Sequence, residues 1–189
     1  MKDKLTLRNL LICIGGFFGI LVFIFSFLPA VRYTNAMADA EYLHILWGAD
    51  AVKNMANGKV EPLQGADKLG PSVLALVGTI LVILGTVCAI VMIFLGEKIF
   101  KDEKIRKIVL FVAGGLIVLG GIFTFFTLEG FYSEVAKKAG ITVEQYKKQL
   151  EAANTTVSCG LPIVSGILAI LGGGAVIGSQ FIPDKKLGK

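Results

Sequence analysis

The chain has 189 residues, of which 54% are hydrophobic and only 17% are charged, and its formal net charge is +5. This composition is too apolar for an ordinary water-soluble domain of this length, so we do not expect water to be its main solvent. The basic surplus does not indicate a nucleic-acid partner, because its distribution along the chain is explained by membrane topology.

Four segments lack Asp, Glu, Lys, Arg and His, at about 9–31, 73–95, 108–128 and 159–182. Each can cross a hydrocarbon layer of about 30 Å as a helix, which takes about 20 residues. The sequence therefore predicts an all-α integral membrane protein with a four-helix transmembrane bundle, in a single membrane domain over 1–189. The first segment exceeds the length of a signal peptide and is expected to stay attached, and cleavage near Pro29-Ala30 is the less favoured alternative.

The basic residues are unevenly distributed between the loops. The two tails and the short loop at about 96–107 hold eleven of the nineteen Lys and Arg residues and five acidic residues. The longer loops, at about 32–72 and 129–158, hold eight basic and nine acidic residues. The positive-inside rule then places both termini in the cytoplasm of a cell membrane and the longer loops outside. Sixteen Lys against three Arg favour a bacterial source.

The first outer loop has apolar residues at helical spacing between Ala36 and Met55, including Ala40, Leu43 and Trp47. This spacing predicts an amphipathic helix rather than strands. We expect the helix to lie on the bilayer surface or to cap the bundle. A docking surface for the outer domain of another protein is the alternative.

Two helices are expected in the second outer loop. The first starts at a cap on Ser133 and ends at Gly140. The second starts at Thr142, where Gln145 completes a capping box, and runs to about residue 153. The residues of both loops that we expect to contact a partner are Tyr42, Trp47, Tyr146 and Leu150.

Glycines are expected to bring the spans together, because lipid provides no hydrophobic drive and small residues allow backbones to approach closely. Packing within one chain is the preferred interpretation, and self-association or docking to a larger membrane protein is the alternative. The glycines expected at helix contacts are Gly15, Gly19, Gly114, Gly115, Gly120, Gly121, Gly174 and Gly178.

The uncharged spans argue against most membrane chemistry. Ion-coupled transport and intramembrane proteolysis depend on Asp, Glu, Lys, Arg or His at membrane depth, and the spans contain none of these residues. Asp39, Glu41, His44 and Asp50 form the only acidic cluster with a histidine, and solvation is their simplest role. The sequence therefore predicts no catalytic residue, cofactor or metal, and no enzyme.

The function that these features favour is that of a small structural or accessory subunit. Its partners would be the lipid bilayer and a larger membrane or envelope protein, or a second copy of itself. A passive channel or carrier for a small or lipid-like solute is the alternative, and an enzyme using the outer loops ranks third.

The layout resembles that of claudin-type junction proteins in outline, with four spans, both ends inside and a longer first outer loop containing Leu46-Trp47. That family has a disulfide-bonded cysteine pair after such a Trp and builds the loop from strands. This sequence has no cysteine pair there, and its loop is expected to be helical, so the resemblance does not extend to function.

Overall fold

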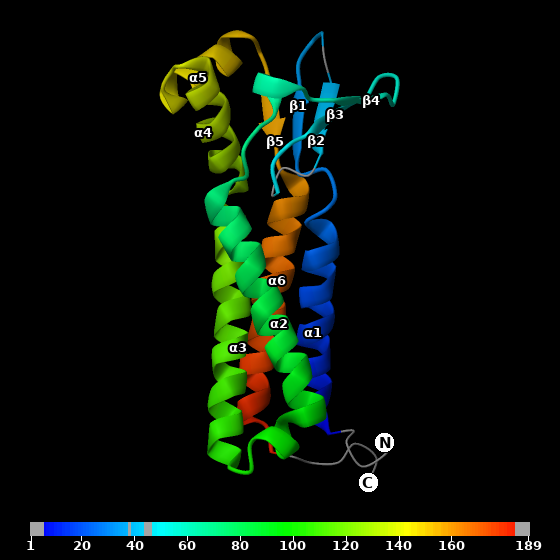
Figure 1. The fold of residues 1–189 in the computed structure, drawn as a ribbon, viewed down its shortest axis with the longest axis vertical. Coiled ribbons are helices and arrows are strands. Elements are labelled where there is room, and N and C mark those ends of the chain that lie inside the picture. The colour runs from blue at the N-terminus through cyan, green and yellow to red at the C-terminus, as the bar shows by residue number, and fades with distance from the viewer. Residues whose placement is uncertain (1–5, 38, 44–46, 184–189) are drawn as a thin grey trace. The chain divides into compact units, whose positions relative to one another are not determined.

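The computed structural model describes residues 6–37, 39–43 and 47–183. It is mostly helical, but the expectation of an all-α protein is wrong, because the structure also contains a five-stranded antiparallel sheet (Figure 1). The long helices are α1 (Leu7–Phe25), α2 (Val73–Ile99), α3 (Glu103–Thr124) and α6 (Gly160–Gly178). Within the described residues, four helical segments are long and apolar enough to span a membrane: Leu7–Phe25, Val73–Gly96, Glu103–Thr124 and Gly160–Phe181. They indicate a multi-pass membrane protein.

The chain divides into two compact units, which we call the bundle unit and the sheet unit. The bundle unit consists of Met1–Phe23, Gly78–Ile122 and Ser165–Lys189, and the sheet unit consists of Ile24–Val77 and Phe123–Val164. Each unit has a hydrophobic core of its own.

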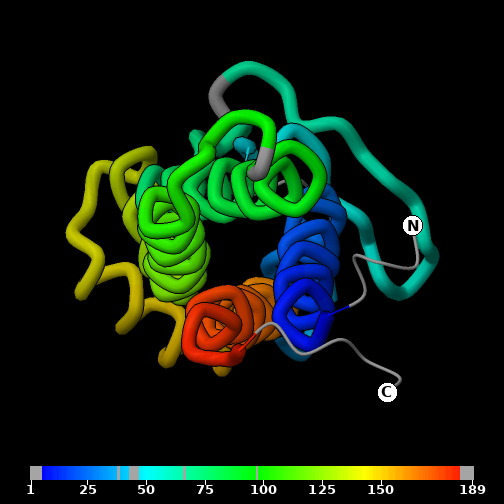
Figure 2. The backbone as a smooth tube through the Cα atoms, turned by 90° about the horizontal axis from the view of Figure 1, so that it is seen from below, coloured from blue at the N-terminus to red at the C-terminus, as the bar shows by residue number. Residues whose placement is uncertain are grey.

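Within the bundle unit the four long helices form a ring in the order α1, α2, α3, α6 (Figure 2). Glycines line the helix contacts. A Cβ atom at Gly15 would lie 2.6 Å from the carbonyl oxygen of Gly172 in α6, and one at Gly114 would lie 2.9 Å from that of Gly173. In the same way Gly85 of α2 lies against the backbone of Ala113 in α3. The backbones therefore approach more closely than any larger residue would allow.

The polarity of the bundle unit suits a hydrocarbon environment. Its interior buries apolar side chains such as Ile12, Val82 and Ile117, together with the hydroxyl-bearing Thr79 and Ser165. Large apolar side chains are exposed on each of the four helices. Hydrocarbon would solvate these exposed side chains, whereas water would not.

Charged and amide groups connect three of the helices at their ends. Arg8 of α1 donates a hydrogen bond to Gln180 Oε1 over 2.9 Å, and its guanidinium lies 3.9 Å from Glu103 of α3. Glu103 also pairs with Lys107 at 2.9 Å. Gln180 follows α6 in the short 3₁₀ helix η3 (Ser179–Phe181).

In the described residues, the sheet unit contains five short strands, two helices and the 3₁₀ helix η2 (Gly65–Asp67). The strands are β1 (Val31–Thr34), β2 (Asp39–Leu43), β3 (Ala51–Asn54), β4 (Val60–Pro62) and β5 (Thr156–Ser158). They are arranged in the order β4-β3-β2-β1-β5, so the last strand pairs with the first across most of the chain. The helices are α4 (Thr127–Ala139) and α5 (Val143–Ala152).

The helix expected between Ala36 and Met55 is wrong. The described part of this range contains β2 and β3 and their connections, while Ala38, His44, Ile45 and Leu46 lie outside the described residues. The strands are so short that apolar and polar residues alternate over only a few positions, and the helical spacing of apolar residues is the stronger signal in the sequence. Strand pairing decides the conformation here, since β2 and β3 pair with each other and also with β1 and β4, respectively. The loop is thus built from strands after all, as in the claudin-type layout, but the cysteine pair remains absent from the sequence.

The second long loop is mostly helical as expected, but it also contains the strand β5. The cap expected at Ser133 is wrong, because α4 already begins at Thr127 and Ser133 lies inside the helix. Gly140 ends α4 in the left-handed conformation, with φ of 68°. The capping box at the start of α5 is complete. The Thr142 hydroxyl accepts a hydrogen bond from the backbone N–H of Gln145, and the side-chain oxygen of Gln145 accepts one from the backbone N–H of Thr142. The first span ends earlier than expected, at Phe25, and Val31 already belongs to β1.

We expect Gly114→Ala to destabilise the bundle unit by about 1–3 kcal/mol, because its new methyl group would overlap Ile177 and the Gly173 carbonyl. Thermal unfolding in mild detergent measures the effect. Gly115→Ala is the matched control, since a Cβ there meets nothing within 4 Å, and it is expected to leave stability unchanged or slightly raised. Equal effects of the two substitutions would contradict the assignment of Gly114 to a helix contact.

Candidate interaction surface

The sheet has one apolar face and one charged face, because successive side chains of a strand point to opposite sides. Val31 and Tyr33 of β1 alternate with Arg32 and Thr34. The register places Arg32 opposite Glu41 of β2, and Glu41 opposite Lys53 of β3. Arg32, Glu41 and Lys53 therefore form one row across three strands, with charges of alternating sign.

The apolar face packs against α4 and α5. Tyr42 lies 5.2 Å from Phe131 between ring centroids, and Tyr132 contacts both Phe131 at 6.1 Å and Tyr146 at 6.0 Å. Phe131 is almost completely buried and belongs to the core of the unit with Val31 and other apolar residues. This aromatic cluster attaches the helical hairpin to the sheet.

Burial changes the acidity of the tyrosines in this cluster. Burial, together with the neighbouring tyrosines, raises the pKa of Tyr146 to about 12. Burial also raises the pKa of Tyr42 and of Tyr132 above the ordinary tyrosine value. These hydroxyls stay neutral at physiological pH and act as polar edges of an otherwise apolar core.

Lys147 joins α5 to α4 beside the cluster. Its ammonium group lies 2.8 Å from Glu129 and 5.0 Å from the centroid of the Tyr132 ring. The hydrogen bond to Glu129 raises the pKa of Lys147. Because both charged groups are well exposed, the pair contributes mainly to orientation rather than to stability.

On the charged face, Arg32 is positioned by Asp39. Two guanidinium nitrogens of Arg32 bind the Asp39 carboxylate, which also accepts a hydrogen bond of 3.1 Å from Thr34. The hydrogen bond to Asp39 raises the pKa of Arg32, and the hydrogen bond from Arg32 lowers the pKa of Asp39. A hollow of about 250 Å³ lies beside this pair, lined by residues that include Arg32, Glu41 and Ser158.

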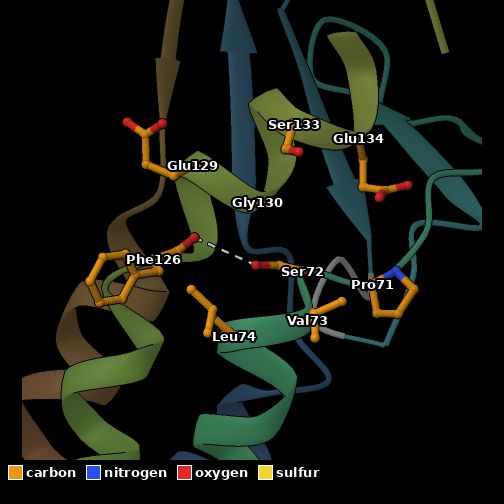
Figure 3. A pocket seen from close by; sticks show the side chains of 9 residues that line it. All are labelled: Pro71, Ser72, Val73, Leu74, Phe126, Glu129, Gly130, Ser133 and Glu134. Atoms are coloured by element: carbon orange, nitrogen blue, oxygen red, sulfur yellow. Dashed lines mark hydrogen bonds between the residues drawn. The ribbon is translucent and has the colours of Figure 1, made fainter. Parts of the chain in front are cut away.

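A second hollow, of about 260 Å³, lies where the chain enters α2 and α4 (Figure 3). The buried Ser72 donates a long hydrogen bond of 3.5 Å to the Phe126 carbonyl, and Gly130 approaches Ser72 closely. Glu129 and Glu134 lie on opposite sides of Ser133, so their carboxylates do not converge on one point (Figure 3). We assign this hollow no ligand.

The four residues expected to contact a partner differ in how far their side chains are exposed. Leu150 is only 7% exposed, and Tyr42 and Tyr146 are half-buried in the aromatic cluster. Trp47 is the exception, with 39% of its surface exposed. Three of the four side chains therefore serve the core of the sheet unit.

The glycines expected at helix contacts fall into two groups. Five of them lie against a neighbouring helix: Gly15, Gly19, Gly114, Gly120 and Gly121. The other three, Gly115, Gly174 and Gly178, have nothing within 4 Å of an added Cβ atom. Gly172 and Gly173 of α6 also make close contacts with neighbouring helices.

The acidic cluster with a histidine does not assemble in the part of the chain that the structure covers. Asp39 is engaged with Arg32, Asp50 is exposed in the loop before β3, and His44 lies outside the described residues. Among residues 6–37, 39–43 and 47–183, no group of His, Cys, Asp and Glu is arranged to hold a metal ion.

Arg32 and Lys53 were not among the expected site residues. The alternation of Val31, Arg32, Tyr33 and Thr34 is the one local signal that could have identified a two-faced strand. The row containing Glu41 exists only through strand pairing, which no local pattern reveals.

No protein-family model matches the chain, and no curated protein matches it.

We expect Tyr146 to titrate at about pH 12 in the folded protein, against an ordinary value of 10.0. The folded state holds this proton more tightly than the unfolded state does. The resulting contribution to the free energy of unfolding is therefore complete below about pH 10 and is lost as the pH rises to about 12. The tyrosinate absorbance of the wild type minus that of Tyr146→Phe isolates this group. A midpoint near pH 10 in the difference titration would contradict its burial.

Proposed function

We propose that the protein is a non-enzymatic multi-pass membrane protein that acts as a structural or accessory subunit. In this proposal both termini lie in the cytoplasm, the sheet unit lies on the outer side of a bacterial cell membrane, and its charged face binds a larger membrane or envelope protein. The uneven distribution of basic residues supports the orientation.

The row formed by Arg32, Glu41 and Lys53 carries the proposal. These residues alternate in sign across adjacent strands, and the Arg32 side chain is 46% exposed. Alternating charges favour a partner with the opposite alternation, and they reject other partners by placing like charges together. The aromatic cluster on the opposite face forms the core of the sheet unit, so the charged face is not needed for packing against α4 and α5.

The bundle unit supports a structural role rather than a chemical one. Its close glycine contacts are made between helices of the same chain. The segments that could cross the membrane have no Asp, Glu, Lys, Arg or His in their central parts. A subunit of this kind needs a stable anchor and a specific outer surface, and these are the two features on which the proposal rests.

We expect Lys53→Glu to weaken capture of the partner about tenfold or more, because it places a carboxylate beside Glu41 and opposes the complementary charge of the partner. Photo-crosslinking from the charged face in the native host, followed by quantitative copurification in mild detergent, measures the loss. Lys148→Glu makes the same charge change on α5 and is the control. Equal capture by both variants, or a particle without a stoichiometric companion, would contradict the proposal.

A passive channel or carrier for a small or lipid-like solute is the second candidate. An apolar groove of about 210 Å³ between α1 and α2 favours it, with Gly19, Phe23, Thr86 and Ile90 among its lining residues. Within the described residues, the buried Thr86 hydroxyl has no hydrogen-bond partner. Solute flux into liposomes that contain the purified protein would support the carrier, whereas flux no greater than in empty liposomes would favour the accessory subunit.

A further inference from the structure

The sheet unit exposes large apolar side chains at each place where its chain joins a long helix. Phe27 and Leu28 follow α1, Val73 begins α2, Phe125 follows α3, and Ile163 lies near the start of α6. These side chains and Trp47 are between 39% and 66% exposed. We call these six residues the apolar collar.

Trp47 joins the collar through tertiary structure alone, since it lies in the connection between β2 and β3. Its ring stacks on Phe27 with centroids 5.7 Å apart and planes inclined by 15°. Its indole N–H donates a hydrogen bond of 3.2 Å to the buried Ser26 hydroxyl. The one polar atom of the side chain is thus satisfied inside the protein, and the exposed remainder of the ring is apolar.

Charged residues follow the collar closely along the chain. Arg32 comes shortly after Leu28, Glu129 comes shortly after Phe125, and Lys68 precedes Val73. A charged side chain is costly in hydrocarbon, whereas Phe is favoured there and Trp is favoured at the membrane–water interface. The change from apolar to charged residues therefore marks a boundary between two solvents.

We infer that the apolar collar of the sheet unit is immersed in the bilayer, with Trp47 in the acyl-chain region just below the glycerol layer. The occupant of this surface is lipid. The bilayer boundary then crosses the sheet unit between the collar and the neighbouring charged residues, so that at α1 and α3 it lies beyond the end of the helix. This inference needs the four spans but does not depend on the proposed partner.

The single tryptophan of the chain makes the inference directly testable. The wild-type protein is reconstituted at low density in phosphatidylcholine vesicles whose acyl chains carry bromine either near the glycerol end or near the methyl end. We expect Trp47 emission to be quenched more strongly by shallow bromine than by deep bromine, and little by aqueous iodide. The experiment leaves the protein unmodified, so no variant has to fold.

Two variants built on Trp47→Phe calibrate the measurement. Trp47→Phe with Val73→Trp moves the fluorophore to another collar position and should reproduce the shallow quenching. Trp47→Phe with Met37→Trp places it in the turn after β1, where Met37 is 98% exposed, and should respond to iodide instead. Three results for Trp47 would overturn the inference: quenching by iodide but not by lipid bromine, stronger quenching by deep bromine, or protection from both quenchers, which would mean that protein covers the ring.

Discussion

Close contact between helix backbones at glycine is the constraint on which the bundle depends. In hydrocarbon, apolar side chains gain nothing by leaving their solvent, so helices associate through packing. Gly15 against Gly172 and Gly114 against Gly173 bring α1 and α3 onto α6, and Gly85 brings α2 onto α3. The ring is closed where Gly19 of α1 lies against Thr86 of α2. The exposed apolar side chains of the same helices then meet lipid without any requirement for a specific partner.

The sheet unit is stabilised differently, because its apolar and aromatic side chains form a core that excludes water. Phe131, Tyr132 and Tyr146 from the helical hairpin cover the apolar face of the sheet, and Tyr42 connects the two layers. The strand β5 comes from the second long loop and pairs with β1 from the first. Two loops that are distant in the sequence therefore fold as one body, with its polar row on the opposite face.

The two surfaces proposed for interaction differ in chemistry. The row of Arg32, Glu41 and Lys53 suits a protein with complementary charges, whereas the collar around Trp47 and Phe27 suits lipid. Docking at a membrane surface depends on orientation, and anchored aromatic side chains restrict the orientations that a protein can adopt. The collar would thus limit how the charged row is presented to a partner, even though neither proposal requires the other.

The sequence by itself determined the four candidate spans, the capping box at Thr142 and the stop at Gly140, because each depends on neighbouring residues or on a long uniform run. It also identified glycines as packing residues, but it could not separate Gly114 from Gly115, because the direction in which each faces depends on where the other helices lie. Only the tertiary structure decided the sheet. Its strands are too short to have a distinctive period, and their stability comes from pairing with other strands, which for β1 and β5 are far apart in the chain. For the same reason, Trp47 could be named as an interaction residue in advance, but its stacking on Phe27 and its hydrogen bond to Ser26 depend on how the folded loop meets the end of α1.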